Sequence, residues 1–580
     1  MSWEQVYEQW ANEENLEENL KQQLNDLRQD PEKLEDAFYA PLEFGTAGMR
    51  GILGPGINRM NIYTVRQATE GLARFMDTQG TEIKKRGVAI AYDSRHQSPE
   101  FAMEAAKTLA QHDIPSFVFE SLRPTPELSF AVRHLNTFAG IMVTASHNPA
   151  AYNGYKVYGE DGGQMPPADA DALTKYVREV SNPLRVEVLE DEKAKASDLI
   201  TIIGEEVDRA YLEEIKAVTI DQELVETMGK DLKLVYTPLH GTGKMLGERA
   251  LKQAGFEQFV LVPEQAIPDP DFTTVKSPNP EEHSAFEYAM RLGEKEDADL
   301  LIATDPDADR LGAAVRQPDG TYKVLTGNQI GALLVQYILE AHQSRGTLPE
   351  NAAVLKSIVS SELPAAIAES YGAKMLNVLT GFKFIAEKIH QFEEDHSQTF
   401  MFGFEESYGY LVKPFVRDKD AIQALLLLAE VAAFYKKQGK TLYDGLQTIF
   451  EKYGYYAEKT ISVTMSGQEG SAKIAALMKQ FRDNAPTEFA GAKVLQTEDF
   501  KELTKTDTEG NVEKLTTPPS DVLKYVLEED GWIAIRPSGT EPKIKFYIGV
   551  KGESAEDAEN EINRYEATVS YTHLTLPTKA

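Results

Sequence analysis

The sequence predicts a multidomain α/β protein in which three α/β domains in succession are followed by a smaller α+β domain. Two observations support this fold class. Short apolar runs, of the length of buried strands, alternate with helix-like segments three times along the chain. The pattern then changes, and the strand-like runs of the last segment flank polar stretches. Because 580 residues are too many for one core, and 42% are hydrophobic, several domains are expected.

We expect the domain boundaries to lie where this pattern changes. The N-terminal helices and the first α/β domain take residues 1–205, and the second α/β domain takes 206–323. The third α/β domain takes 324–455, and the α+β domain takes 456–567. Residues 568–580 do not continue the acidic helical pattern before them, so we expect a non-native tail outside the fold.

The composition excludes several classes of function. Sixty basic and 92 acidic residues give a net charge of -32, which would repel nucleic acid and anionic lipid. There is no cysteine, so thiol nucleophiles, thiolate zinc sites and disulfides are excluded. The N-terminus lacks the pattern of an export signal, and the most apolar run, 424–429, is too short to span a membrane. We therefore expect a cytoplasmic protein with no nucleic-acid or membrane partner.

The N-terminal 40 residues carry apolar side chains at the spacing of amphipathic helices. A glycine-dense loop follows, with the sequence Phe44-Gly45-Thr46-Ala47-Gly48-Met49-Arg50-Gly51. Glycines let the backbone approach a ligand closely, and Arg50 could bind a phosphate with two hydrogen bonds. Glycine-rich turns with an arginine are common, so the loop alone is a weak signal.

The first alternation predicts strands at 88–92, 116–119 and 141–143, with a helix over 98–111. Strands that alternate with helices indicate a largely parallel sheet, whose ligand sites collect at the carboxyl ends of the strands.

A hydroxyl group stands at the end of the last of these strands. The run 141–143 leads into a small-residue turn that places Ser146 and His147 side by side before Pro149. A strand would fix the serine oxygen while the turn leaves it reachable, which suits a nucleophile. A polar turn that hydrogen-bonds its own backbone fits the same residues, and both interpretations stay open here.

A lysine follows ten residues after this serine, at position 156. The pair Asn153-Gly154 lies between two strand-like runs and predicts a hairpin turn, which would fold Lys156 back alongside Ser146. Lys156 could then serve as an acid or a base. A solvated lysine on an edge strand is the equal alternative.

The second alternation predicts strands at 232–236 and 298–303. The latter leads into three carboxylates that alternate within five residues, a pattern that favours a hard cation such as Mg²⁺ with open positions for water or phosphate oxygens. An EF-hand is excluded, because its sixth and twelfth positions would be Arg310 and Arg316 in place of glycine and glutamate. The run in question is Thr304-Asp305-Pro306-Asp307-Ala308-Asp309-Arg310.

The third alternation contains the loops 379–384 and 404–410. The second of these carries Glu405 and Ser407, whose carboxylate and hydroxyl suit the hydroxyl groups of a sugar. Lys419 precedes the apolar helix predicted over 421–437, where charged residues more often cap the helix.

The last segment predicts a helix over 470–483 and strands at 532–535 and 543–550. Between these strands lies a loop with a guanidinium group, hydroxyls and backbone amides, which together favour a phosphate. Its sequence is Arg536-Pro537-Ser538-Gly539-Thr540-Glu541-Pro542.

Four of these motifs, in this order, make the chain resemble the α-D-phosphohexomutase family over residues 40–565. They are 144–149, 305–310, 405–407 and 536–540. The glycine-dense loop and the helical N-terminus are similar to the branch that holds bacterial phosphoglucomutases and related phosphopentomutases. The resemblance implies four domains around a central cleft, three of them α/β with mixed sheets.

The resemblance also implies roles for individual residues. It matches Ser146 with the family's phosphoserine, which also contributes an oxygen to the metal. The residues matched to the transferring phosphoryl group are Arg50, His147, Lys156, Arg310 and Lys419. The metal ligands are Asp305, Asp307 and Asp309. The residues matched to the sugar and its distant phosphate are Gly381, Glu405, Ser407, Arg536, Ser538, Gly539 and Thr540.

The activity that the resemblance implies is the interconversion of glucose 1-phosphate and glucose 6-phosphate. It would use a phosphoserine, Mg²⁺ and glucose 1,6-bisphosphate as intermediate and activator. Phosphopentomutase, phosphomannomutase and a metal-dependent sugar phosphatase are the alternatives. The sugar loop has Tyr408-Gly409-Tyr410 where the phosphomannomutase-type branch has a histidine, which leaves the sugar open. The expected partner is a small sugar phosphate, and the expected state is a monomer or homodimer.

Overall fold

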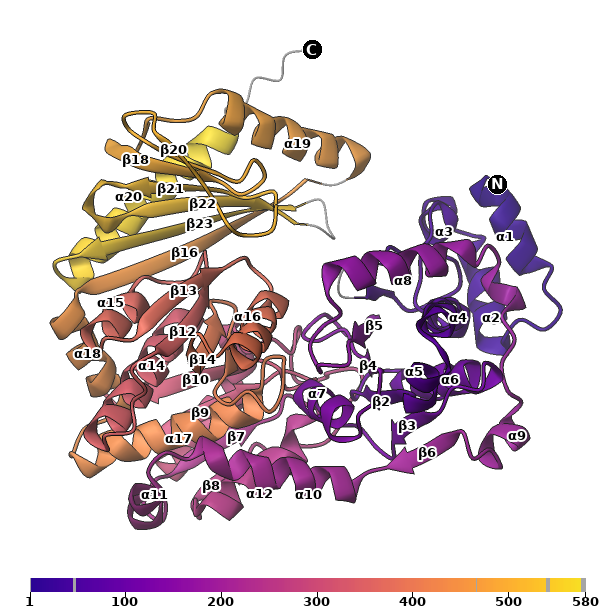
Figure 1. Cartoon of the computed structure of the whole chain (residues 1–580), viewed down its shortest axis with the longest axis horizontal. Helices are drawn as coiled ribbons and strands as arrows, with labels where there is room; N and C mark the ends of the chain where they lie inside the picture. Colours follow the sequence, from indigo (N-terminus) through magenta and orange to yellow (C-terminus); the bar gives the residue numbers. More distant parts are fainter. Residues whose placement is uncertain (1, 45–47, 466, 539–542, 575–580) are drawn as a thin grey trace. The chain divides into compact units, whose positions relative to one another are not determined.

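The computed structural model describes residues 2–44, 48–465, 467–538 and 543–574. The chain forms two compact units. Figure 1 labels their helices and strands. The first unit consists of Met1–Ile330 and Ile385–Tyr443, and the second of Gly331–Phe384 and Asp444–Ala580.

Three short helices open the first unit: α1 (Trp3–Ala11), α2 (Glu18–Leu27) and α3 (Pro31–Phe38). Their apolar faces close over Trp10, which meets Phe38 and Tyr63 edge to face with ring centroids 5.8 and 5.4 Å apart. The amphipathic helices predicted for the first 40 residues are therefore present, and they pack as one cluster with the start of the next helix.

A mixed six-stranded sheet follows, in the order β1-β5-β4-β2-β3-β6. Strands β4, β2, β3 and β6 are parallel to one another, whereas β5 pairs antiparallel with β4 and β1 pairs antiparallel with β5 at the opposite edge. The strands are β1 (Met49–Ile52), β2 (Val88–Tyr92), β3 (Ser116–Phe119), β4 (Ala139–Val143), β5 (Tyr152–Tyr158) and β6 (Ile200–Ile203). The helices are α4 (Ile62–Gln79), α5 (Thr81–Arg86), α6 (Ser98–Gln111), α7 (Thr125–His134), α8 (Pro167–Glu179), η1 (Pro183–Arg185) and α9 (Asp191–Lys195).

The predicted hairpin turn at Asn153-Gly154 is wrong, because both residues lie inside strand β5. The chain reverses earlier, between β4 and β5, and Lys156 still comes beside β4 through its pairing with Met142. Gly154 is a glycine because the backbone of Thr144 passes close to it. A Cβ at this position would lie 2.4 Å from the carbonyl oxygen of Thr144, a distance that real Cβ atoms do not show.

The second sheet of the first unit has the order β11-β10-β9-β7-β8 and is also mixed. Its strands β8, β7 and β9 are parallel to one another. Strand β10 pairs antiparallel with β9, and β11 pairs antiparallel with β10. They are β7 (Leu234–Thr237), β8 (Phe259–Leu261), β9 (Leu300–Thr304), β10 (Leu311–Arg316) and β11 (Tyr322–Val324). The helices of this part are α10 (Glu205–Glu214), η2 (Ile215–Val218), α11 (Gln222–Met228), α12 (Gly243–Ala254), η3 (His283–Phe286) and α13 (Glu287–Glu296).

The first unit is completed by the hairpin of β14 (Thr399–Glu405) and β15 (Gly409–Leu411) and by helix α17 (Ala421–Lys437). Helix α17 is apolar on nearly every side and packs against α11 and α12, which explains its almost complete burial. It matches the helix predicted over 421–437.

The second unit contains the parallel strands β12 (Ala352–Ser357) and β13 (Lys374–Val378) with helix α15 (Leu363–Ser370). Its large antiparallel sheet has the order β16-β23-β22-β21-β18-β19-β20, with β17 paired to β18. These strands are β16 (Tyr455–Thr464), β17 (Glu488–Phe489), β18 (Ala492–Asp499), β19 (Thr504–Asp507), β20 (Val512–Lys514), β21 (Leu523–Leu527), β22 (Trp532–Pro537) and β23 (Lys543–Gly552). The helices are α19 (Gly467–Asp483), η4 (Glu528–Asp530) and α20 (Ala555–Leu574), and three more join the units: α14 (Gly327–Ser344), α16 (Phe382–Asp395) and α18 (Leu442–Tyr453).

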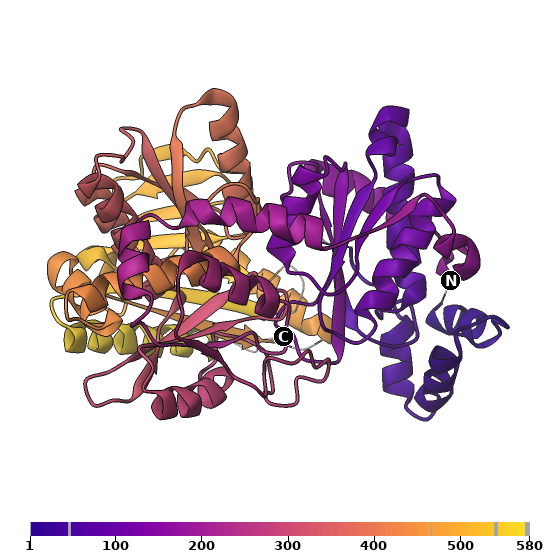
Figure 2. The same cartoon turned by 90° about the horizontal axis from the view of Figure 1, so that it is seen from below.

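The last domain differs from the sequence analysis in two places. The polar stretch after 483 forms strands β17 to β21, which carry too few alternating apolar residues to be recognised in the sequence. Helix α20 also continues to Leu574, past residue 567 where its pattern was expected to end. Figure 2 gives a second view of the structure, with the indigo N-terminal helices grouped together.

The predicted fold class is confirmed: three α/β domains with mixed sheets precede a C-terminal domain built on an antiparallel sheet. In the part of the chain that the structure describes, each helix is too short or too polar to cross a membrane.

We predict that Gly154→Ala destabilises the first unit, because the new methyl group would push β5 away from the carbonyl oxygen of Thr144. Overpacking of this kind costs about 1–3 kcal/mol. The matched control is Gly159→Ala, where a Cβ would meet its nearest neighbour, Asp161, at an ordinary 3.4 Å. Urea unfolding of both variants tests this, and equal stability of the two would contradict the close approach.

Candidate active site

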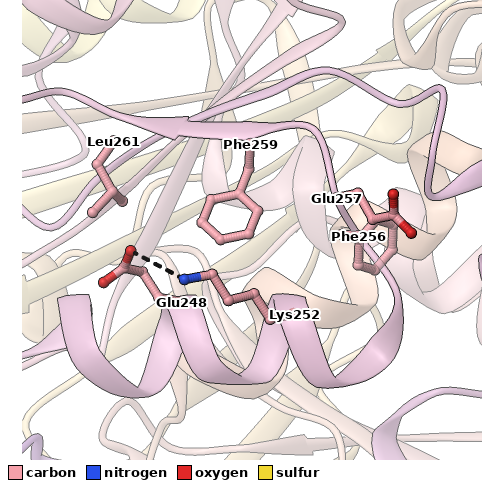
Figure 3. A pocket seen from close by; sticks show the side chains of 6 residues that line it. All are labelled: Glu248, Lys252, Phe256, Glu257, Phe259 and Leu261. Carbon is pink, nitrogen blue, oxygen red and sulfur yellow. Dashed lines mark ion pairs between the residues drawn. The ribbon is translucent and has the colours of Figure 1, made fainter.

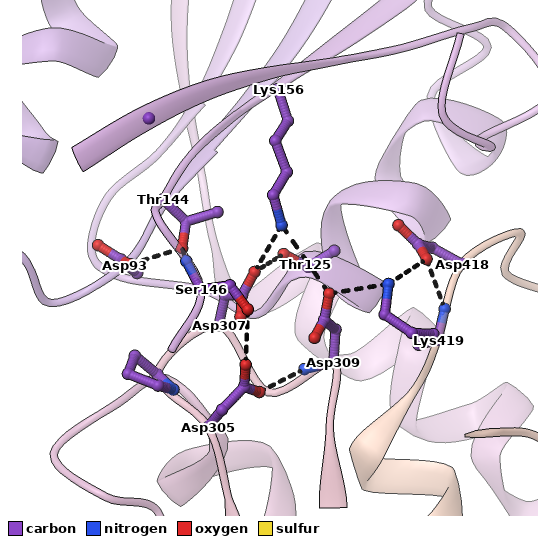
Figure 4. Close-up of polar contacts among 12 residues, drawn as sticks. Asp93, Thr125, Thr144, Ser146, Lys156, Asp305, Asp307, Asp309, Asp418 and Lys419 are labelled. Atoms are coloured by element: carbon purple, nitrogen blue, oxygen red, sulfur yellow. Dashed lines mark hydrogen bonds and ion pairs between the residues drawn. The ribbon is translucent and has the colours of Figure 1, made fainter. Parts of the chain in front are cut away.

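Ser146 lies in the turn after β4 and is held in a left-handed backbone conformation with a φ of 52°. Non-glycine residues seldom adopt this conformation, and where they do the surroundings must enforce it. The Ser146 amide donates to Thr144 Oγ1 at 2.8 Å, and the Ser146 hydroxyl donates to Asp305 Oδ2 at 2.8 Å. The serine is only 4% exposed, so its hydroxyl is fixed on a carboxylate (Figure 4).

A buried arginine supports this turn from behind. The guanidinium of Arg95 donates to the carbonyl oxygens of Ser146, Pro149 and Tyr152 at 2.6, 2.9 and 3.0 Å. Asp93 pairs with Arg95 at 3.2 Å and accepts a hydrogen bond from the Thr144 hydroxyl at 2.6 Å. Side chains at the end of β2 therefore determine the shape of the serine turn, a role that the sequence analysis missed.

Asp305, Asp307 and Asp309 stand in the loop between β9 and β10, and all three are buried. One carboxylate oxygen from each lies within 4.8 Å of the others. Lys156 meets Asp307 Oδ2 at 3.0 Å and Asp309 Oδ2 at 3.9 Å, and Lys419 meets Asp309 Oδ2 at 3.1 Å. Two lysines from distant parts of the chain thus offset three clustered carboxylates (Figure 4).

The three carboxyl groups differ in their pKa values. Burial raises the pKa of Asp305 well above its ordinary range, and the charges of Asp307 and Asp309 raise it further. Burial alone would also raise the pKa of Asp307, but Lys156 and hydrogen bonds bring it below the ordinary value. The pKa of Asp309 is raised by burial and by Asp307, although Lys419 opposes the shift. The cluster is therefore electrostatically strained, a condition that a bound cation would relieve.

The donor atoms fit a hard divalent cation. Asp307 Oδ1 and Asp309 Oδ1 are buried and have no hydrogen-bond partner among the described residues. Asp305 Oδ1 accepts from the backbone amides of Asp309 and Arg310 at 3.1 and 3.0 Å, which fixes the loop. An all-oxygen set of this kind suits Mg²⁺, with Ser146 Oγ beside it.

Lys419 is not the cap of helix α17, which was the alternative interpretation. The cap is the next residue, Asp420, whose Oδ1 accepts from the amides of Ile422 and Gln423 at 2.9 and 3.1 Å. Lys419 instead lies between Asp309 and Asp418, at 3.1 and 3.0 Å. Burial alone would lower the pKa of Lys419, but these two carboxylates raise it above the ordinary value, so the side chain is charged.

Two further predicted residues flank the serine. Arg50 on β1 is exposed and donates through Nη1 to Asn148 Oδ1 at 2.8 Å. His147 Nδ1 lies 3.2 Å from Ser146 Oγ. Burial, together with the positive charges of Arg310 and Arg50, lowers the pKa of His147 well below its ordinary value, so its ring is neutral at pH 7.

Arg310 forms an ion pair with Glu281. Burial alone would lower the pKa of Arg310, but Glu281 and Asp309 raise it, so the guanidinium is charged.

The loop predicted to bind the sugar is joined to the acidic loop by backbone contacts. Gly409 forms an isolated β-bridge with Arg310, and the Leu311 amide donates to the Tyr408 carbonyl at 3.0 Å. Glu405, at the end of β14, is 5% exposed and close enough to Arg310 and Lys419 to raise the pKa of each, so it belongs to this cluster.

The tyrosines of the sugar loop are engaged elsewhere in the first unit. The Tyr408 hydroxyl donates to the carbonyl of Leu325 at 3.0 Å, and the Tyr410 hydroxyl donates to the carbonyl of Gly327 at 3.2 Å. Ser407 stands in the turn between β14 and β15, two residues from Glu405. Contacts therefore bring together the predicted residues of the first unit other than Ser407, which is placed only by its position in this turn.

The remaining predicted residues lie in the second unit. Gly381 has a φ of 122°, which favours glycine. Arg536 and Ser538 form the base of the hairpin of β22 and β23, while Gly539 and Thr540 lie outside the described residues. Lys545 stands directly opposite Arg536, and like charges in this position destabilise a sheet unless an anion lies nearby. Lys545 was missed, because only the strand register reveals the pairing.

A different pocket of about 380 Å³ lies between α12 and β8 (Figure 3). Lys252 and Glu248 of the helix form an ion pair at 3.9 Å there, beside Phe259 and Leu261. None of its lining residues belongs to the cluster around Ser146.

Comparison with known protein families gives matches along most of the chain. Domain I of phosphoglucomutase/phosphomannomutase, an alpha/beta/alpha domain, matches residues 41–183. Domains II and III of the same family match 209–320 and 326–453, and its C-terminal domain matches 489–563.

Curated relatives and solved structures agree with these matches. A phosphoglucomutase of Staphylococcus aureus is 42% identical over 554 residues, which cover 95% of this chain and 96% of that protein. A phosphoglucomutase from Staphylococcus epidermidis is 44% identical over 524 residues, which cover 90% of this chain and 93% of that protein. A structure of a putative phosphomannomutase from Thermus thermophilus shares the fold, with a TM-score of 0.68, 22% identity and coverage of 92% and 99%. The structure of parafusin, a phosphoglucomutase from Paramecium, has a TM-score of 0.67 and 17% identity, and the match covers 93% of this chain and 97% of that one.

We predict that Asp307→Asn weakens the binding of a divalent cation at least about tenfold, since it removes one of three charged ligands. Titration of the variant with Mn²⁺, followed by the electron paramagnetic resonance of the free ion, measures the dissociation constant. Asp319→Asn, in an exposed turn of the same domain, is the control and should bind as the wild type. Equal affinity in Asp307→Asn would remove the acidic loop from metal binding.

Proposed function

The chain belongs to the phosphoglucomutase/phosphomannomutase family, and we propose that it is a phosphoglucomutase that interconverts glucose 1-phosphate and glucose 6-phosphate. The observation that carries the proposal is the 2.8 Å hydrogen bond between Ser146 Oγ and Asp305, one of three buried carboxylates, of which Asp307 and Asp309 each have an oxygen with no hydrogen-bond partner among the described residues. A phosphoryl group carried on the Ser146 oxygen would therefore lie next to a divalent cation bound by the aspartates. The phosphoglucomutase relatives support glucose as the sugar.

The first half-reaction starts from phosphorylated Ser146. A hydroxyl oxygen of the sugar phosphate attacks the phosphorus, so that a new O–P bond forms while the bond between phosphorus and Ser146 Oγ breaks. The departing Ser146 oxygen takes a proton from the ammonium group of Lys156, and the amine so formed takes the proton of the attacking hydroxyl, so we assign Lys156 as both acid and base. The product of this step is glucose 1,6-bisphosphate, which also serves as the activator that restores phosphoserine.

Asp305, Asp307 and Asp309 would hold the Mg²⁺, together with an oxygen on Ser146. Bound there, Mg²⁺ supplies neutralisation of the charge on the phosphoryl oxygens. The chain supplies position and further positive charge through Arg50, Arg310 and Lys419. Glu405 and Ser407 would hold the hydroxyl groups of the sugar, as carboxylates and hydroxyls do.

The second half-reaction returns the other phosphoryl group to Ser146. The Ser146 oxygen attacks the phosphorus at the opposite end of the bisphosphate, the bond from that phosphorus to the sugar oxygen breaks, and Lys156 returns the proton to the sugar. The neutral ring of His147, with Nδ1 at 3.2 Å, can accept the proton that Ser146 loses, and transfer of that proton to the Lys156 amine restores both groups. The net change is the position of one phosphoryl group on the sugar.

The second unit contributes a phosphate-binding loop to this proposal, on chemical grounds. Arg536, Ser538, Gly539 and Thr540 offer a guanidinium, hydroxyls and amides, and Lys545 adds a charge opposite Arg536. The loop would bind the phosphate that is not being transferred. Gly381 is assigned to the sugar on the family resemblance.

The test is a panel of glucose, mannose, ribose and deoxyribose 1-phosphates, each with and without a bisphosphate primer. We expect glucose 1-phosphate to be isomerised fastest and the primer to raise the rate. Ser146→Ala should lose several orders of magnitude in turnover, because a covalent nucleophile is gone. Ser116→Ala is the control, since that hydroxyl is equally buried and has no hydrogen-bond partner among the described residues.

Other outcomes separate the alternatives. Faster turnover of mannose or pentose phosphates would assign a different mutase activity. Release of inorganic phosphate without isomerisation would indicate a metal-dependent phosphatase, and binding without either reaction would indicate a sugar-phosphate binder. Full activity of Ser146→Ala, with phosphate mapped to another residue, would overturn the mechanism.

We predict that Arg536→Ala raises the KM for glucose 1-phosphate and lowers turnover less. A charge-assisted contact of this kind contributes about 1.5 to 3 kcal/mol. The variant should still take a phosphoryl group from the bisphosphate onto Ser146, which intact mass spectrometry measures. Arg564→Ala, on helix α20 of the same unit, is the control and should leave KM unchanged. If Arg536→Ala bound substrate normally but could not retain phosphoserine, the loop would belong to the transfer site instead.

A further inference from the structure

Thr125, the first residue of helix α7, contacts the acidic loop through two hydrogen bonds. Its backbone amide donates to the carbonyl oxygen of Asp307 at 2.9 Å, and its hydroxyl donates to Asp307 Oδ2, also at 2.9 Å. The two residues are 182 positions apart in the sequence, and both are fully buried. One threonine of the first sheet domain therefore fixes both the backbone and the carboxylate of Asp307 (Figure 4).

The two oxygens of the Asp307 carboxylate have different surroundings. Oδ2 accepts from the Thr125 hydroxyl at 2.9 Å and from Lys156 Nζ at 3.0 Å, whereas Oδ1 has no hydrogen-bond partner among the described residues. Two donors on one oxygen determine the rotation of the carboxylate plane. The other oxygen, Oδ1, is left available to an ion that the three aspartates could share.

The hydroxyl of Thr125 does not serve its own helix. The N-cap of α7 is Pro124, which offers no side-chain cap, and within the described residues the Thr125 hydroxyl donates to Asp307. A threonine that only began the helix could be replaced by valine with little effect. The contact with a candidate metal ligand indicates a different purpose.

The start of α7 is itself held in place. Arg123, two residues earlier, binds Asp208 of α10 with two hydrogen bonds of 2.7 and 2.9 Å, and its amide donates to Tyr92 at 3.1 Å. One turn into the helix, the Ser129 hydroxyl donates to the carbonyl of Gly162 at 2.6 Å. Thr125 therefore presents its hydroxyl from a fixed support.

We propose that Thr125 is a positioning residue for the metal site, which orients Asp307 so that Oδ1 is directed at the cation. It acts through Asp307 and touches neither the substrate nor the reacting atoms. The proposal rests on the proposed function, in which Asp307 is a metal ligand. Hydrogen-bond partners of metal ligands typically contribute about 10–100-fold to metal affinity.

The test compares two substitutions in the full chain. Thr125→Val keeps the shape of the side chain and removes the donor, whereas Thr125→Ser keeps the donor. We expect Thr125→Val to bind Mn²⁺ about 10–100-fold more weakly and Thr125→Ser to bind close to wild type. Free Mn²⁺ is measured by electron paramagnetic resonance without substrate, so the readout does not depend on turnover. High Mg²⁺ should restore much of the turnover of Thr125→Val.

Thr108→Val is the matched control for the loss of a buried threonine hydroxyl. Thr108 lies in α6 of the same domain, is fully buried, and donates to the carbonyl of Glu104 at 2.8 Å. The Thr108→Val variant should bind Mn²⁺ with the affinity of the wild type. Circular dichroism and thermal unfolding of the three variants report whether each is folded.

Each result decides the proposal. Unchanged Mn²⁺ affinity in Thr125→Val would overturn it, as would equal weakening in Thr125→Ser or Thr108→Val. If Thr125→Val does not fold, Thr125→Ser carries the test, and weak Mn²⁺ binding in that folded variant would overturn the role of the hydroxyl. A wild type that binds no Mn²⁺ would overturn this proposal and the proposed function together, whereas an active, metal-binding wild type with an unaffected Thr125→Val overturns this proposal alone.

Discussion

The close approach of three buried carboxylates is the constraint on which the rest of the site depends. Like charges within 4.8 Å of one another, away from water, repel strongly unless positive groups or donors surround them. The chain supplies those groups from several distant segments: Lys156 on β5, Lys419 before α17, Thr125 at the start of α7, and amides of the acidic loop itself. The two sheets of the first unit must therefore pack closely, because these positive groups and hydrogen-bond donors have to reach the same few carboxylate oxygens.

The bond between Ser146 and Asp305 crosses from the first sheet to the second, so its length depends on how rigidly these sheets are held. Arg95 binds the backbone of the serine turn, and Gly154 allows β5 to lie against Thr144. On the other side, α17 is buried almost completely and presents Lys419 to Asp309 just before its first residue. A hydroxyl group strained into a left-handed turn is useful only when both of its neighbours are fixed this firmly.

Much of the fold and the centre of the site could be predicted from the sequence, because their signals are local. Buried strands such as β2 and β3 are continuous apolar runs, and three aspartates in five residues can be recognised without knowledge of the fold. The supports could not be predicted in this way. The contacts of Thr125 and Arg95 depend on packing across about 50 to 180 residues, and the pairing of Lys545 with Arg536 depends on the strand register. A threonine at the start of a helix is unremarkable in sequence. The error at Gly154 has the same origin, since a glycine that permits a close approach looks like a glycine that makes a turn.

The orientation of the carboxylates also bears on how an acidic chain can bind a phosphate. The lysines contact the Oδ2 atoms of Asp307 and Asp309, while the Oδ1 atoms carry no hydrogen bond within the described residues. A cation on Oδ1 and a lysine on Oδ2 can therefore be accommodated by the same carboxylate. Asp418 adds a fourth negative charge beside Lys419, so two lysines and one divalent ion would together balance the four carboxylates. The exposed guanidinium of Arg50 then supplies positive charge beyond that balance, which a phosphate needs on a chain of net charge -32.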